Sequence, residues 1–414
     1  MEGVARVRTA RAVTCLGAVL AVLIWAPGTA AFHGPPVHVG LLGPLTGFET
    51  DLGTAIVQGA RAAQLAVNEA GGVLGRELVL DAADTKGDAG DAVPAINKLI
   101  GIDRVVAIVG PEDMEYYAVR PIFTRSHIPD IMQGGSVTLD HETNPYFWRD
   151  SPSDSVMAVA MALYAHRMGY TRAAVMVVAE QSAQTLTVPL VQAFRKLGGA
   201  ILADVTIQPG QTSYRSEVLR LMSAHPQVIF TETDAASAGV IFANFKEVND
   251  LAIPFIGTDV TAGDEYLRAL TYPVAHDHLT SIAGASVAGR GYFERYYGRL
   301  YPGRQPLANA NYAYDAVISA ALAIDRAGST DGPQVNAAMT TVTNPPGTPC
   351  ADYADCLRLL RAGTKITYEG AGGSLAYNRY HNVFGAFAAF RVDLRGGEHQ
   401  IAVMSESELA EAAP

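Results

Sequence analysis

Cysteine and charge are both scarce in this chain. Of its 414 residues, three are cysteine and 17% are charged, whereas 49% are hydrophobic. A chain of this length and composition can bury a large core, but it is too long for one ordinary domain. We therefore expect two lobes.

Long apolar runs are absent except near the N-terminus. Arg6, Arg8 and Arg11 precede an apolar run from Ala12 to Trp25, and small residues follow at 29–31. This pattern predicts a secretory signal peptide over residues 1–31, and export across the inner membrane to the periplasm. No later stretch reaches eighteen uninterrupted apolar residues, so we expect a soluble mature chain without a membrane span. That mature chain keeps 27 basic and 40 acidic residues, a net charge of −13, which makes nucleic acid a poor partner.

Signatures of catalysis are also missing. Ser-x-x-Lys, Gly-x-Ser-x-Gly and phosphate-loop patterns do not occur. His276 and His278 could share a metal only on a strand, whereas Pro273 nearby favours a surface loop. We therefore expect no enzyme, no cofactor and no metal site.

Two cysteines remain once the signal peptide is removed, Cys350 and Cys356 in "CADYADC". An oxidising compartment favours a disulfide between them. Two thiols without a nearby Cys or His pair are half a zinc site, so we favour the disulfide.

Short aliphatic strands alternate with amphipathic helices from Val37 onward. A helix over residues 53–70 carries one apolar stripe, formed by Ile56, Ala60, Ala63 and Val67. The alternation predicts a parallel sheet covered on both faces. It restarts after residue 150 with strands at 173–179, 200–207, 227–231 and 254–257, so it predicts a second sheet of the same kind.

The end of the chain fits neither a third sheet nor a linker. Two helical stretches, 291–302 and 311–329, precede a hairpin expected over residues 372–393. We interpret this as the chain returning to the first lobe and then crossing again, so that several strands form the hinge. The predicted lobes are residues 37–150 with 283–383, and 151–282 with 384–404.

Several motifs in this order resemble one family. They are "GPLTG", "GARAAQLAVNEAGGVLGRELVL", "NPYFWRDSPSD", "PFIGTDV", "YAYDAVISAALAIDRAG" and "YEGAGGSLAYN". Together they resemble type I periplasmic binding proteins, in the branch that includes the leucine/isoleucine/valine-binding proteins. The resemblance covers nearly the whole mature chain. It implies two doubly wound α/β lobes that close like a clamshell on a small solute, and a monomer that delivers this solute to ABC transporter permease subunits.

The resemblance also implies where a ligand carboxylate would bind in the first lobe. The matching positions fall near Met114 and Glu115, and at Gly135 and Ser136. Gly135 is expected to leave backbone groups open, and Ser136 offers a hydroxyl. At the first pair of positions relatives commonly have serine, whereas this chain has "EDME".

An acid about 4 Å from a ligand carboxylate would cost roughly 4 kcal/mol at an effective dielectric constant near 20. Two alternatives follow. Either Asp113 and Glu115 point to solvent while backbone N–H groups at the helix start still bind an anion, or the solute is not a plain α-amino acid.

In the second lobe the resemblance assigns an ammonium-binding acid to Asp259, for which a helix cap is the alternative role. Gln181, Thr233 and Asp234 replace aromatic residues common in relatives, which indicates a more polar pocket. Phe48, in the turn after the first strand, could supply an apolar wall or pack within its lobe. We expect a binding protein for an amino acid or an amino-acid-like solute. The alternative is a diffusible ligand-sensing partner of a membrane signalling protein.

Overall fold

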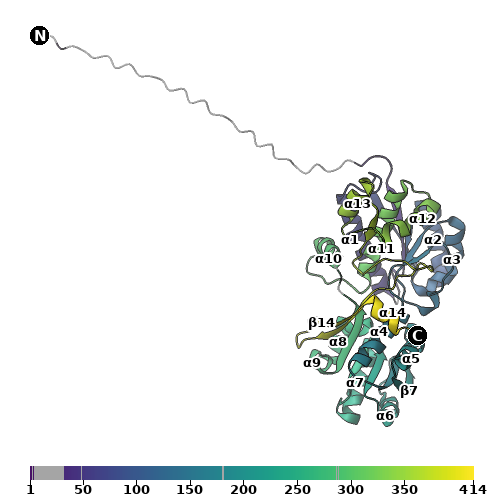
Figure 1. The fold of residues 1–414 in the computed structure, drawn as a ribbon, viewed down its shortest axis with the longest axis vertical. Coiled ribbons are helices and arrows are strands. Elements are labelled where there is room, and N and C mark those ends of the chain that lie inside the picture. Colours follow the sequence, from purple (N-terminus) through teal and green to yellow (C-terminus); the bar gives the residue numbers. More distant parts are fainter. Residues whose placement is uncertain (2, 4–31, 48, 180, 286, 288) are drawn as a thin grey trace. The chain divides into compact units, whose positions relative to one another are not determined.

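The computed structural model describes residues 1, 3, 32–47, 49–179, 181–285, 287 and 289–414. Residues 32–414 form one unit by their contacts, and Figure 1 labels its elements. Apart from Met1 and Gly3, the predicted signal peptide lies outside the described residues. Among the helices that are described, none is both long and apolar enough to cross a membrane.

The first sheet consists of five parallel strands in the order β2-β1-β3-β4-β5. In chain order the strands are β1 (Val37–Gly43), β2 (Leu78–Asp84), β3 (Ile108–Val109), β4 (Asp130–Met132) and β5 (Phe147–Arg149). The central strands are buried almost throughout, as expected for a sheet covered by helices on both faces. This confirms the first of the two predicted sheets.

Helix α1 (Thr50–Glu69) follows β1 and buries its predicted apolar stripe. Gly71 and Gly72 follow the helix with φ values of 100° and 74°, a backbone conformation that glycine adopts without strain. The sequence therefore located both the buried face of this helix and its end. The other helical segments between β2 and β5 are α2 (Ala89–Lys98), the π-helical turn η1 (Leu99–Asp103), α3 (Asp113–Ser126) and η2 (Val137–Leu139).

The chain returns to the first sheet near residue 290. The returning elements are α10 (Arg290–Leu300), α11 (Ala310–Ala327), α12 (Gly332–Thr343), β11 (Thr348–Cys350), α13 (Tyr353–Arg361) and β12 (Ile366–Tyr368). Helix α11 lies against α1, as Figure 1 shows, and a Cβ on Gly59 would come within 1.9 Å of the Ala310 carbonyl oxygen. Glycine at this position therefore permits the close packing that joins both parts of the first lobe in one core.

A disulfide joins Cys350 at the end of β11 to Cys356 in α13, with a Cα–Cα distance of 5.4 Å. The structure thus confirms the predicted pairing. The small parallel pair β11–β12 lies beside it.

The second sheet repeats the winding of the first. Its strands β6 (Arg172–Val178), β7 (Ala200–Ile207), β8 (Val228–Glu232), β9 (Phe255–Gly257) and β10 (Leu279–Gly284) are parallel, in the order β7-β6-β8-β9-β10. Its helical segments are α4 (Asp154–Arg167), α5 (Gln181–Lys196), α6 (Arg215–Ser223), α7 (Ala235–Asn249), η3 (Asp259–Ala262), α8 (Asp264–Leu270) and α9 (Tyr272–His278). Both lobes therefore have the same doubly wound order, and the predicted second sheet is confirmed.

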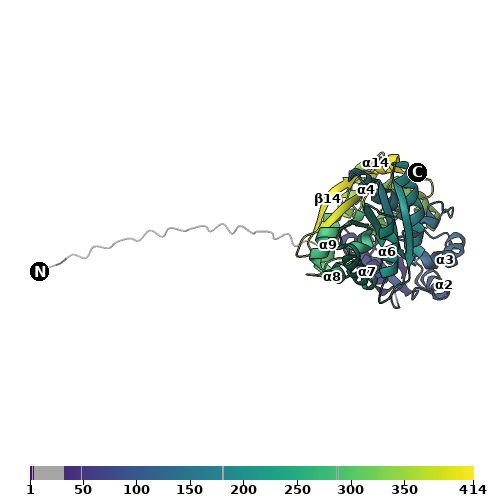
Figure 2. The same cartoon turned by 90° about the horizontal axis from the view of Figure 1, so that it is seen from below.

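Two antiparallel strands extend the second sheet beyond β10. They are β13 (Phe387–Val392) and β14 (Glu398–Met404), and α14 (Glu406–Ala412) follows and packs on α4. Figure 2 shows β14 and α14 in yellow beside α4. The hairpin predicted over residues 372–393 is wrong in its first half. There the backbone is held elsewhere: Asp315 accepts hydrogen bonds from Ala371 and Gly372, and the carbonyl of His381 accepts one from the backbone of Arg149.

Three crossings connect the two lobes. The chain passes from the first sheet to α4 after Arg149, returns after β10, and crosses again between Val383 and β13. Backbone hydrogen bonds join these crossings in pairs, from Val383 to Arg149 and from Ala285 to Ala386. The expected multi-strand connection is therefore present, while the lobe boundaries given above stay a prediction.

Candidate solute-binding site

The predicted site residues lie at equivalent places in the two sheets. In the first lobe they follow β1, β3 and β4, and in the second they follow β6, β8 and β9. These are the carboxyl ends of strands that occupy the same positions in the two identical winding orders. Ligands of open parallel sheets bind at such ends, so topology supports the region predicted from the sequence.

The acidic segment after β3 forms the first turn of α3 and is more buried than its composition suggests. Glu112 is the N-cap residue and is 8% exposed, and Glu115 is fully buried. The Glu115 carboxylate accepts a hydrogen bond of 2.5 Å from the hydroxyl of Thr85. Glu115 thus does not point to solvent, which was one of the two alternatives for this turn, because Thr85, thirty residues earlier in the chain, provides a buried partner. Met114 is the exposed residue of this turn, at 59%.

The carboxylate of Asp113 accepts a hydrogen bond from the backbone group that, by the resemblance, would bind a ligand. Its Oδ2 atom accepts a hydrogen bond of 3.0 Å from the backbone N–H of Ser136. A Cβ on Gly134 would lie 2.1 Å from Asp113 Oδ1, so glycine is needed for the carboxylate to approach this loop. The expectation of an open backbone donor beside Gly135 is therefore corrected, since a carboxylate of the chain itself binds there.

Gly135 and Ser136 have local partners as well. The Gly135 carbonyl accepts a hydrogen bond from the backbone of Asp154, at the start of α4. The Ser136 hydroxyl lies 2.8 Å from the hydroxyl of Thr138 and caps η2. Gly135 thus links the loop after β4 to the first turn of α4.

Arg149, at the end of β5, is a residue that sequence reasoning missed. Its side chain is fully buried, donates 2.8 Å to the Ser136 carbonyl, and forms an ion pair of 2.6 Å with Asp140. Its positive charge also acts on Asp113 and opposes the effect of burial on the pKa of that residue, which is raised. The motif "FWRD" predicts only the end of a buried strand. The arrangement of the loops in the structure is what brings its arginine to Asp140 and Asp113.

The candidate residues of the second lobe differ in how many hydrogen bonds they make within the protein. Thr233 is buried and its hydroxyl lies 3.1 Å from that of Tyr266. Asp234 caps α7 through a 2.8 Å hydrogen bond from the Ser237 backbone, so its structural role is evident. Gln181 begins α5, but its side chain, like the whole of Phe48, lies outside the described residues.

Asp259 is the first residue of η3 and accepts a hydrogen bond of 3.0 Å from the backbone of Val260. The N-cap of η3 is Thr258, so Asp259 is not the capping residue that the alternative role required. Burial raises the pKa of Asp259, with backbone hydrogen bonds opposing the shift.

Carboxylates from both lobes influence one another electrostatically. Burial, and then the charges of Asp113, Glu115 and Glu49, raise the pKa of Glu112 to about 8. Burial raises the pKa of Asp154 well above its usual value, and the charges of Glu232, Asp259 and Asp113 add to this effect. We call this set the acidic cluster; its members are Glu49, Glu112, Asp113, Glu115, Asp154, Glu232 and Asp259.

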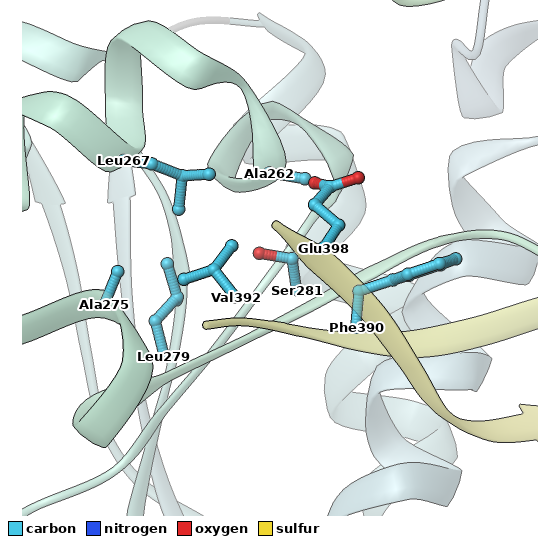
Figure 3. A pocket seen from close by; sticks show the side chains of 8 residues that line it. All are labelled: Ala262, Leu267, Ala275, Leu279, Ser281, Phe390, Val392 and Glu398. Carbon is cyan, nitrogen blue, oxygen red and sulfur yellow. The ribbon is translucent and has the colours of Figure 1, made fainter. Parts of the chain in front are cut away.

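A small cavity inside the second lobe is a separate feature. Figure 3 shows it among η3, α8, α9 and the strands β10, β13 and β14. Its volume is about 10 Å³, and six of its eight lining side chains are apolar, with Ser281 and Glu398 as the exceptions. This space suffices for about one water molecule, so it is no solute site.

The two histidines considered as metal ligands lie in a helix. His276 and His278 belong to α9 instead of the surface loop that Pro273 suggested, and His276 contacts the Val392 carbonyl at 2.6 Å. Proline at the start of a short helix is compatible with its missing N–H. Within the described part of the chain, no group of three His, Cys, Asp or Glu residues could hold a metal ion.

Comparisons with known proteins agree with this architecture. The family model described as "Periplasmic binding protein" matches residues 36–355. A substrate-binding protein of a chemotactic signal transduction system, BasB from Halobacterium salinarum, is 26% identical over 362 residues, which cover 83% of each chain. A match of 39% identity to the Leu/Ile/Val-binding protein BraC3 of Rhizobium johnstonii spans only 75 residues, 20% of that protein.

Solved structures share the fold. The leucine-binding protein LivK of Thermotoga maritima superposes with a TM-score of 0.72 at 21% identity, over 90% of this chain and 99% of that one. LivJ of Streptococcus pneumoniae, solved with isoleucine, has a TM-score of 0.71 at 19% identity, over 89% of this chain and 98% of its own. This chain therefore belongs to the periplasmic binding proteins, and it has the type I fold that the leucine-binding protein LivK and LivJ also have.

Proposed function

We propose that this protein is an extracytoplasmic solute-binding protein of an ABC importer. In this proposal it captures a small polar solute in the periplasm as a monomer and presents it to permease subunits. The observation that carries the proposal is the repeated strand order: two sheets of identical winding direct polar residues from equivalent strand ends, in a chain that belongs to a solute-binding family.

The mechanism is a shift between two states of the lobes. A solute that touches both lobes stabilises the closed state by the difference between its affinities for the closed and the open form. Asp259 supplies the second-lobe contact, and the segment from Glu112 to Ser136 supplies the first. Proteins of this family bind solutes, and the proposed role requires neither a cofactor nor a covalent step.

A thermal-shift screen of the mature protein tests the proposal. The panel contains aliphatic, polar and basic amino acids, short amides, urea, aromatic acids and diamines. Aromatic acids are included because a solute-binding protein of Rhodopseudomonas palustris with the same fold was solved with benzoate. A solute at about 100 times its dissociation constant stabilises the folded state by about 2.7 kcal/mol, which is readily measured. If no class of compound raised the melting temperature, the proposal would be wrong.

Ligand sensing is the second candidate function. It is favoured by the similarity to BasB, which acts in chemotactic signal transduction and matches most of this chain. Uptake of the labelled solute by a deletion strain separates the two functions. Loss of uptake supports import, whereas normal uptake with a lost behavioural response supports sensing.

A further inference from the structure

At the first-lobe end of the site, a carboxylate of the chain itself is bound to a backbone donor. Asp113 Oδ2 accepts the Ser136 N–H at 3.0 Å, and Asp113 Oδ1 has no hydrogen-bond partner among the described residues. A ligand carboxylate in this place would lose the donor and would face a like charge. This part of the site therefore disfavours the carboxyl end of a plain amino acid.

Glu112 is a second carboxylate at this end, and it lacks a partner. The residue is more than nine-tenths buried, and within the described ranges its side chain makes no hydrogen bond or ion pair. The charges that act on it belong to Asp113, Glu115 and Glu49, all of them negative. These surroundings keep Glu112 protonated near neutral pH in the ligand-free protein, and a cation bound beside it would favour the ionised carboxylate.

Glu115 extends the same arrangement. It is fully buried, its Oε1 atom accepts from Thr85 at 2.5 Å, and its Oε2 atom has no hydrogen-bond partner among the residues described. Glu112 and Glu115, at the start of α3, therefore both have carboxylate oxygens that accept no hydrogen bond from the described residues.

Arg149 does not neutralise these glutamates. The Arg149 guanidinium is bonded to Asp140 at 2.6 Å and to the Ser136 carbonyl at 2.8 Å. Its charge acts on Asp113 and Asp154, whereas the charges acting on Glu112 are those of the acids named above. The charges that act on Glu112 and Glu115 are negative, so a bound cation would stabilise the ionised form of both.

The second lobe is acidic at the corresponding place. Asp259 and Glu232 both act on Asp154, and Asp113 of the first lobe acts on the same residue. We propose that the solute is an organic dication, with one protonated amine bound by Glu112 and Glu115 and the other by Asp259. This inference rests on the proposed function and specifies its solute class. A divalent metal ion fits less well, because no group of three metal-binding side chains is found within the described ranges.

Isothermal titration of the mature protein with cadaverine and with δ-aminovalerate tests this inference. The two compounds have the same carbon chain, but δ-aminovalerate carries a carboxylate in place of one ammonium group. We expect cadaverine, or its shorter homologue putrescine, to bind at least about tenfold more tightly, as for one charge-assisted hydrogen bond. Tighter binding of δ-aminovalerate or of L-leucine would overturn the inference.

Variants connect the preference to the glutamates. Glu112→Gln should weaken diamine binding by about tenfold or more and leave δ-aminovalerate binding unchanged or improved. Glu77→Gln, at an exposed position before β2, is the matched control and should change neither affinity. Glu115→Gln provides an independent variant if Glu112→Gln does not fold. Diamine affinity unchanged in both variants would remove these residues from the site.

The pH dependence separates two opposite uses of Glu112. If the ionised carboxylate binds an ammonium group, diamine affinity rises with pH as Glu112, facing Asp113, Glu115 and Glu49, loses its proton near pH 8. If a protonated Glu112 donated to a solute carboxylate instead, affinity would fall over the same range, and the inference would be wrong. Should a neutral or anionic solute bind while no diamine does, this inference fails and the proposed function stands.

Discussion

Glu112→Gln should make the ligand-free protein more stable at alkaline pH, although the substitution removes a charge at the site. Glu112 is buried among carboxylates, and its pKa is raised from 4.5 to about 8. A carboxyl group whose pKa rises on folding contributes stability that is fully present below its unfolded pKa. This stability is lost as pH rises towards the folded pKa. Glutamine has similar size and no proton to lose, so the variant does not suffer this loss.

The expected magnitude follows from the two pKa values. The difference between 4.5 and about 8 corresponds to at most about 5 kcal/mol, at about 1.4 kcal/mol for each pH unit. Because the charges of Asp113 and Glu115 act on Glu112, the three groups titrate together, and the measured gain should be smaller. We expect the variant to match the parent within about 1 kcal/mol near pH 5, and to exceed it by about 2–4 kcal/mol near pH 9.

Urea unfolding at both pH values measures this difference, with Glu77→Gln as the exposed control. The midpoint should shift at the alkaline pH without a change in the slope. A stability difference between variant and parent that is the same near pH 5 and near pH 9 would refute the reasoning. It would mean that Glu112 is not held neutral by its surroundings.

Three further predictions concern other parts of the molecule. Asp259→Ala should weaken solute binding at least about tenfold, measured by titration, with little change in melting temperature, because the hydrogen bond of Asp259 to the Val260 backbone is local. Unchanged affinity would exclude Asp259 from the site. Arg149→Met should lower the free energy of unfolding by about 3–5 kcal/mol, because Asp140 and the Ser136 carbonyl lose a buried partner. Arg167→Met, at a surface ion pair, should lower it by less than about 1 kcal/mol, and equal losses in the two variants would contradict this prediction. Thiol titration of the unfolded mature protein should give no signal until reductant is added, and two reactive thiols would exclude the Cys350–Cys356 disulfide.

The repeated sheets could be predicted because their signal is local. The stripe on α1 and the aliphatic run of β7 (Ala200–Ile207) are readable from spacing within one element, and both were confirmed. The hairpin near the C-terminus was misplaced because distant partners hold its first half. Asp315 binds the backbone at 371 and 372, and no pattern within residues 372–393 indicates that contact.

The state of the acids at the site could not be predicted for the same reason. Glu112 and Glu115 follow Gly-Pro and look like an exposed tip. In the structure both are buried, Thr85 donates to Glu115, and the charge of Glu49 acts on Glu112. The sequence did indicate that the chain departs from its relatives at these positions. It could not indicate that Asp113 binds the Ser136 N–H, because that contact depends on how two separate loops are arranged.

A crystal structure of the protein with a solute identified by the thermal-shift screen tests the central claim most directly. The account predicts that this molecule lies at the carboxyl ends of both sheets, within hydrogen-bonding distance of Asp259 and of a residue between Glu112 and Ser136. A solute bound to one lobe alone, or away from these strand ends, would contradict it.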